Sequence, residues 1–200
     1  MTIGTRKTNA WAMAATVAAA LLLASCATEV KRIGAGEARD ISGAWNDTDS
    51  RMVSEEMIRD SLSAGWIDRY SLSLKKRPVV IIGSIRNLSQ EHINTNALVN
   101  DLERALVNSG RVDVVASGSV RGDIGEEGAD MDLNATEAMG EETGADYMLT
   151  GSINTIIEAA AGERVRFYQV DLALVSLPDK TKVWVGQKKV KKEIKNAKFR

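Results

Sequence analysis

The sequence predicts an α/β fold: a single three-layer domain over residues 45–200, with a mixed β-sheet of about five or six strands, helices on its faces and a C-terminal β-hairpin. Three observations lead to this prediction. Apolar strand patterns alternate with amphipathic helix patterns along the chain. The unbroken apolar run at 79–82 is typical of a central strand that is covered on both faces. Two long alternating segments flank Pro178, as in a hairpin.

The domain is expected to open with a short strand at Trp45, followed by a helix over residues 51–64. Gly65 would end this helix. Its apolar stripe has helical spacing and consists of Met52, Val53, Met57, Ile58 and Leu62.

Asp47 and Asp49 precede this helix and have three interpretations. Helix capping is favoured, because Asp is a preferred N-cap residue. A calcium loop of the EF-hand type is disfavoured, because Arg51 and Met52 stand where that pattern needs a ligand and a glycine. A hydrolytic site would pair one of these carboxylates with His92, the single histidine, but a lone histidine in a polar loop is more often solvated.

A strand at 78–85 and a polar loop at 86–94 come next. Asn94 or Thr95 then caps an amphipathic helix that Gly110 would end. The apolar face of this helix consists of Leu98, Leu102, Ala105 and Leu106. Residues 111–115 alternate, which predicts a strand whose Val112 and Val114 face inward.

Residues 117–132 are rich in glycine and acids and are expected to form a surface loop, since they lack the lysine and the hydroxyl residue of a phosphate-binding P-loop. Asn134 and Glu137 predict the start of a weak helix that ends before Gly144. A strand over 145–153 follows.

The hairpin is predicted from two strands joined at 178–181. Gln169 and Asp171 would face one side of its first strand, and 183–185 are the apolar part of its second strand. The opposite side of the first strand carries Tyr168, Val170, Leu172 and Leu174. Residues 187–200 are strongly basic, and two interpretations stay open: an anion-binding surface, or lysines that deter edge-to-edge pairing.

Composition excludes several function classes. The chain has 26 Lys and Arg against 27 Asp and Glu, so no global charge favours nucleic acid. One cysteine excludes a disulfide within the chain, and one histidine with one cysteine disfavours a transition-metal site. We expect no cofactor, no small-molecule substrate and no catalytic residues.

The N-terminus is typical of a secretory signal over residues 1–25: Arg6 and Lys7, then an apolar run of about 14 residues, too short to span a bilayer. The segment Leu-Ala-Ser-Cys at 23–26 resembles the bacterial lipobox, which implies cleavage between Ser25 and Cys26 and acylation of Cys26. The alternative is an ordinary signal that leaves a free thiol. Residues 27–44 hold few large apolar side chains, so 26–44 are expected to form a short flexible tether.

Several segments, in this order after a lipobox, resemble the LpoB family of outer-membrane lipoproteins. The resemblance covers residues 43–192. It rests on 45–51, 79–83, 87–95, 106–115, 144–147, Gly151 and the closing hairpin with Trp184.

The resemblance implies a domain related to the N-terminal domain of TolB and to CsgG. It also implies a regulator without an active site, which binds and activates a class A penicillin-binding protein in peptidoglycan synthesis. Ala27 after Cys26 implies a lipid anchor at the periplasmic face of the outer membrane. The alternative function is an accessory lipoprotein of another envelope machine, in secretion or fibre assembly. Known family members carry a long Pro-rich linker, whereas Pro78 and Pro178 both lie in the predicted domain.

Overall fold

The computed structural model describes most of the predicted domain, and the chain divides into two compact units, Met1–Glu37 and Ala38–Arg200. In the first unit, the backbone N–H of Glu37 donates to the carbonyl of Gly34. All helices and strands named below belong to the second unit. The described residues are 32–34, 37, 40, 42–115, 140, 142–160 and 163–195, without the side chains of 159, 160, 163 and 195.

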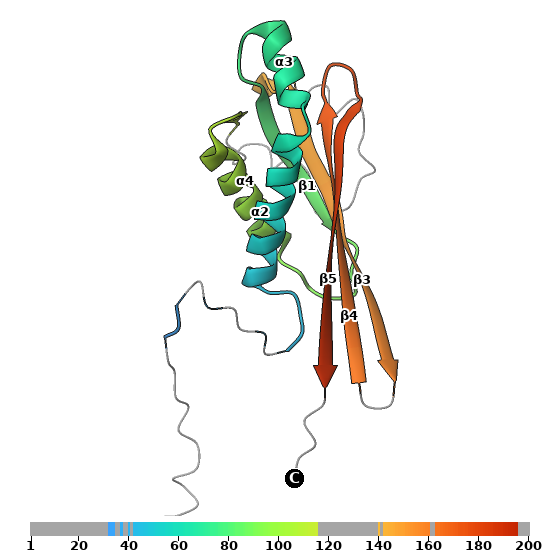
Figure 1. Ribbon diagram of the computed structural model, residues 1–200. Helices are drawn as coiled ribbons and strands as arrows, with labels where there is room; N and C mark the ends of the chain where they lie inside the picture. Colours follow the sequence, from blue (N-terminus) through green and yellow to red (C-terminus); the bar gives the residue numbers. More distant parts are fainter. Residues whose placement is uncertain are drawn as a thin grey trace, which may run out of the picture. The chain divides into compact units, whose positions relative to one another are not determined.

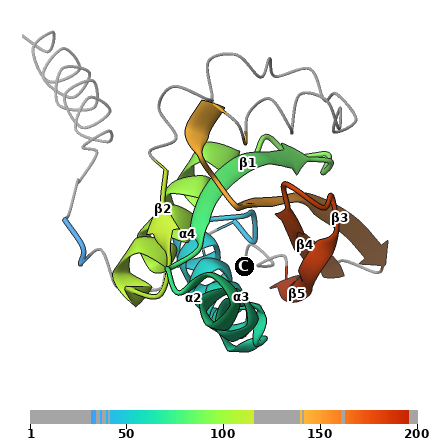
Figure 2. The same cartoon turned by 90° about the horizontal axis from the view of Figure 1, so that it is seen from above.

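The second unit is a mixed α/β fold whose five-stranded sheet has the order β2-β1-β3-β4-β5 (Figure 1; β2 is labelled in Figure 2). Strand β1 runs parallel to β2 and β3, whereas β3, β4 and β5 are antiparallel. This confirms the predicted fold class and the C-terminal hairpin. The elements are α2 (Asp47–Ser63), α3 (Trp66–Leu74), β1 (Val79–Asn87), α4 (Thr95–Ser109), β2 (Asp113–Val114), β3 (Tyr147–Ala160), β4 (Glu163–Ser176) and β5 (Lys182–Lys195).

The expected strand at Trp45 is wrong, and the first helix begins four residues earlier than expected. Asn46 explains the early start: its side chain accepts from the N–H of Asp49 at 3.1 Å, and the Asp49 carboxylate accepts from the N–H of Asn46 at 3.0 Å. This reciprocal capping box satisfies two otherwise free donors. Trp45 instead packs edge-on against the ring of Tyr168, at 5.5 Å between centroids.

Helix α3 has no counterpart among the predicted elements. Gly65, at φ 71°, ends α2 and turns the chain directly into α3. The buried indole of Trp66 then donates to the carbonyl of Ser61 at 2.7 Å and contacts Tyr147 edge-on. These contacts join α3 to the end of α2 and to the start of β3.

Strand β1 is buried on both faces, as its sequence predicts. Val80 and Ile82 join the main core beneath the described helices, which lie on one face of the sheet (Figure 2). Ile81 points the other way and packs with Met148 and Leu177. The predicted loop at 117–132 and most of the predicted helix at 134–143 lie outside the described residues; Glu142 and Thr143 are helical, and Gly144 follows at φ 65°.

Strands β3 and β4 form a second hairpin, which was not predicted, and β3 continues beyond the predicted end at 153 to Ala160. Gly151 lies in β3 opposite Leu172. A Cβ at this position would overlap the carbonyl oxygen of Asp171, so glycine lets the two backbones approach.

Helix α4 begins at the Asn94 cap and ends at Gly110, as predicted, and provides the first testable prediction. Leu102 is fully buried, so Leu102→Ala should lower the free energy of unfolding by about 2–5 kcal/mol in urea titrations. Val107 on the same helix is 53% exposed, and Val107→Ala should cost less than about 0.5 kcal/mol. Equal losses in the two variants would contradict the packing described here.

Candidate functional site

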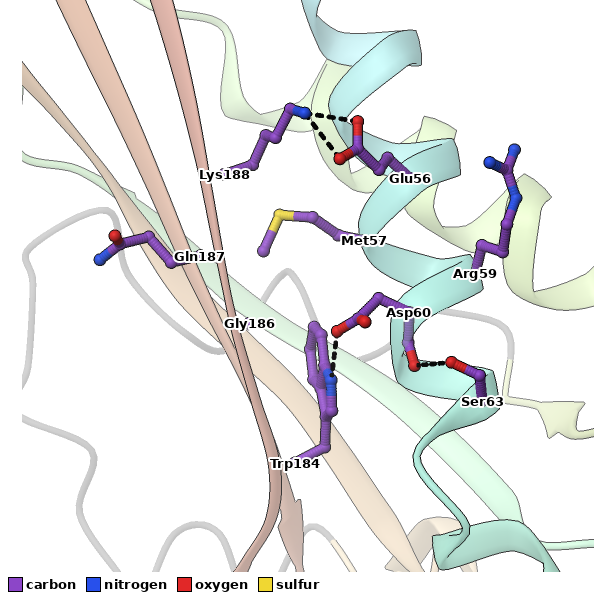
Figure 3. Close-up of a pocket in the computed structure, with 9 residues that line it drawn as sticks. All are labelled: Glu56, Met57, Arg59, Asp60, Ser63, Trp184, Gly186, Gln187 and Lys188. Carbon is purple, nitrogen blue, oxygen red and sulfur yellow. Dashed lines mark hydrogen bonds and ion pairs between the residues drawn. The ribbon is translucent and has the colours of Figure 1, made fainter.

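A pocket of about 430 Å³ opens between helix α2 and the edge strand β5 (Figure 3). Met57 forms an apolar part of its lining and is 3% exposed. The helix and the strand lie far apart in the sequence and meet because both pack against the same core. The remaining lining residues are Glu56, Arg59, Asp60, Ser63, Trp184, Gly186, Gln187 and Lys188.

The residues of β5 that line this pocket include three on one face of the strand. Trp184, Gly186 and Lys188 are two residues apart, so they share the face of β5 that meets the helices. Gly186 leaves the space that the indole of Trp184 occupies, because a Cβ there would overlap the ring. The Trp184 ring is therefore held flat along its own strand, with its N–H directed at α2 (Figure 3).

The polar groups of the pocket contact one another. The Nε1 of Trp184 donates to Asp60 Oδ2 at 2.9 Å, and the Nζ of Lys188 donates to Glu56 Oε1 at 2.6 Å. The Ser63 hydroxyl donates to the Asp60 carbonyl at 2.7 Å. Because both carboxylates already have donors, the pocket offers a shaped, mixed polar and apolar surface rather than a nucleophile beside a base.

A second polar cluster surrounds Lys192 on β5. Its Nζ lies 2.9 Å from the carbonyl oxygen of Ala44, 2.5 Å from Asp49 Oδ2 and 2.9 Å from Asp40 Oδ2. The side chains of Lys192 and Asp49 are 9% and 7% exposed. This buried ion pair joins the segment before α2, the first turn of α2 and the end of β5.

Tyr168 forms a third cluster next to Lys192. Its hydroxyl donates to Glu91 Oε2 at 2.8 Å and lies 3.2 Å from the carbonyl of Gly43. Arg166 pairs with the other oxygen of Glu91 at 2.9 Å. Burial, together with the Glu91 hydrogen bond, raises the pKa of Tyr168 to about 12, so the phenol stays protonated and donates over the ordinary pH range.

The candidate catalytic residues do not come together as a site. Asn46, rather than Asp47 or Asp49, is the N-cap of α2. Asp47 is the first residue of the helix, and Asp49 completes the capping box and contacts Lys192. His92 is exposed in the loop before α4. Within the described residues, no group of three or more His, Cys, Asp or Glu side chains could hold a metal ion.

Ser25 and Cys26 lie outside the described residues, so their predicted roles in cleavage and lipid attachment stay predictions. None of the helices in the described part of the chain is long and apolar enough to cross a membrane.

Sequence reasoning missed the pocket and the buried Lys192. The available signal was the alternation of β5: counting in twos from Trp184 places Lys188 and Lys192 on the inner face, and Lys189 and Lys191 on the outer face. The basic segment therefore has two faces with different partners.

The buried ion pair at Lys192 leads to a second prediction. Lys192→Ala leaves Asp49 buried without its cation, so the free energy of unfolding should fall by about 3–5 kcal/mol in urea titrations. The adjacent Lys191 is exposed, and Lys191→Ala should change it by less than about 0.5 kcal/mol. A small loss in both variants would mean that the pair contributes little.

The fold resembles that of one solved domain at low sequence identity, and a second structure matches more weakly. The LpoB C-terminal domain from Escherichia coli matches with a TM-score of 0.50 and 16% identity, over 71% of this chain and 98% of that one. The lipoprotein GNA1162 from Neisseria meningitidis matches with a TM-score of 0.48 and 15% identity, over 60% and 86% of the two chains. No curated protein matches this sequence.

A family match extends over most of the folded unit. The model of the family described as "Peptidoglycan-synthase activator LpoB" matches residues 49–190, from the first turn of α2 to near the end of β5. The chain therefore belongs to the LpoB family of peptidoglycan-synthase activators.

Proposed function

We propose that this protein is an outer-membrane lipoprotein that binds a class A penicillin-binding protein and activates its peptidoglycan synthesis. The observation that carries the proposal is the family match over residues 49–190, which includes the pocket and most of the core. The similar LpoB domain from Escherichia coli supports the same fold.

Activation would act through contact rather than through chemistry on the glycan. The carboxylates of the α2–β5 pocket are held by Trp184 and Lys188, and Asp49 is held by Lys192. A domain whose pocket side chains are fixed in this way is suited to hold a partner enzyme in one conformation, because a ligand shifts an equilibrium by its differential affinity for two states.

The anchor in this proposal is Cys26, the single cysteine of the chain. A signal over residues 1–25 would be removed before it, and the acyl chains on Cys26 would hold the protein at the periplasmic face of the outer membrane. Residues 26–44 would connect this anchor to the domain at 45–200. Two or more acyl chains are enough for stable membrane attachment.

Cys26→Ser tests the anchor. We expect the wild-type protein to float with membranes in a density gradient, and its intact mass to show loss of residues 1–25 and gain of acyl chains. The serine variant should lack both mass changes and leave the washed membrane fraction, because the thiol that carries the lipid is absent. Ser25→Ala is the matched control, since it keeps a small residue beside Cys26. Acylation of the Cys26→Ser variant would contradict the proposal.

Synthase assays test the activation. The acylated protein in detergent micelles should bind a class A penicillin-binding protein of the same organism with a Kd of about 1 µM or tighter, as expected for a specific interface. It should also raise the rate at which that enzyme polymerises lipid II. Binding without stimulation, or neither, against every class A enzyme of the organism would contradict the proposed function.

The same assay locates the surface that contacts the synthase, by comparing two Lys→Glu variants at different positions on β5. Lys188→Glu reverses a charge in the pocket, whereas Lys182→Glu makes the same change at the exposed start of the strand. Loss of stimulation in the first variant alone would place the synthase at the pocket. Loss in neither would place it elsewhere on the domain.

A further inference from the structure

The segment that leads into the domain is fixed to one end of the sheet. Lys192 near the C-terminal end of β5 holds the Asp40 carboxylate and the Ala44 carbonyl. Gly43 lies against Ile194, close enough that a Cβ at Gly43 would overlap that side chain. Asp40, Gly43 and Ala44 therefore lie beside residues 192–194.

The strand register places the β3–β4 hairpin at the same end. Ile157, Arg166 and Lys192 form one cross-strand row, and Ile156, Phe167 and Lys191 form the adjacent row. Neighbouring strands are about 4.8 Å apart, so the backbones of Ile157 and Lys192 are separated by about 10 Å. Figure 1 shows this end of the three strands extending past the described helices.

Apolar, aromatic and basic side chains lie together at this end, beside the exposed acids Glu158 and Glu193. Ile156 is 58% exposed and Ile157 is 40% exposed, although both lie in a paired strand. The ammonium of Lys189 lies over the ring of Phe167, at 5.7 Å from its centroid. We name this surface the hairpin-end patch; it consists of Ile156, Phe167, Lys189 and Lys191, which share the outer face of the sheet.

We propose that the hairpin-end patch rests on the lipid surface in which the acyl chains of Cys26 sit. This inference rests on the proposed lipid anchor. Fourteen residue steps separate Cys26 from Asp40, and they span at most about 50 Å when fully extended. Asp40 therefore lies within about 50 Å of the membrane surface, and the patch lies at the same end of the sheet as this attachment point.

The chemistry of the patch fits an anionic lipid surface. Aliphatic and aromatic side chains enter the boundary between headgroups and acyl chains, while lysines keep their ammonium groups at the phosphates. Glu158 and Glu193 lie beside the patch and offset the charge of its two lysines. Apolar contact therefore has to act together with charge. The occupant is a lipid headgroup layer, because the length and the attachment point of the tether bring the patch to one.

Lysine footprinting on vesicles tests this orientation. The acylated full-length protein is placed in nonionic detergent micelles, in phosphatidylcholine vesicles and in vesicles that also contain phosphatidylglycerol. Acetylation rates of Lys189 and Lys191 are measured by mass spectrometry relative to Lys182, which is exposed at the other end of β5. On anionic vesicles the first two lysines should react about fivefold more slowly than in micelles, the factor expected for a basic side chain at an anionic surface.

Two variants separate the patch from the rest of the sheet. Ile156→Asp should abolish the protection of Lys189 and Lys191, because it places a charge in the apolar part of the patch. Val185→Asp makes the same kind of change at a residue that is 63% exposed and lies far from the hairpin end, and it should leave the protection unchanged. Urea titrations of both variants would check that they fold.

The outcomes distinguish this inference from the proposed anchor. A protein that floats with the vesicles but whose Lys189 and Lys191 react as fast as in micelles would overturn the lipid-resting patch alone. A protein that leaves the vesicles would overturn the anchor and the patch together. Protection that depends on protein density rather than on anionic lipid would assign the patch to a second copy of the chain and also overturn the inference.

Discussion

The ion pair between Lys192 and Asp49 determines how the N-terminal part of the domain meets the sheet. It joins residues that are 143 positions apart, and both side chains are almost completely removed from water. A buried charge is costly unless its partner is well placed, so the first turn of α2 and the end of β5 are restricted to one arrangement. The α2–β5 pocket and the entry of residues 40–44 both follow from that arrangement.

The sequence predicts those parts of the fold whose signals are local. Helix α4 has its cap at Asn94 and its glycine stop at Gly110, and the first strand of the C-terminal hairpin alternates from Tyr168 to Leu174, so both match. Trp45 was misjudged because an aromatic residue favours a strand, whereas the adjacent Asn46 and Asp49 side chains capture the backbone for a helix. Helix α3 has nine residues, and its contacts to Ser61 and Tyr147 lie outside its own sequence.

The candidate site was not predictable in the same way, because it depends on which strand lies beside α2. The hydrogen bond between Trp184 and Asp60 joins residues 124 positions apart. The one between Lys188 and Glu56 joins residues 132 positions apart. No local pattern encodes such a separation. Alternation alone does divide the lysines of β5 into an inner and an outer set. Lys192, on the inner face, forms a structural ion pair, whereas Lys189 and Lys191 are exposed. Of these three lysines, only the outer two can therefore serve as the anion-binding surface that the basic segment suggests.

Anchoring at Cys26 would leave the opposite end of the sheet for the partner. A strand of 14 residues such as β5 is about 46 Å long, so its start lies well away from Lys192 and the tether. Helix α3 contacts the first residue of β3 at that distant end, and its Leu72 is 81% exposed. If the hairpin-end patch rests on lipid, the pocket lies along the side of the domain and α3 lies farthest from the membrane. A synthase rooted in another membrane would then meet α3 before it meets the pocket. If residues 26–44 form a short tether, the synthase, rather than this protein, would have to extend across the gap.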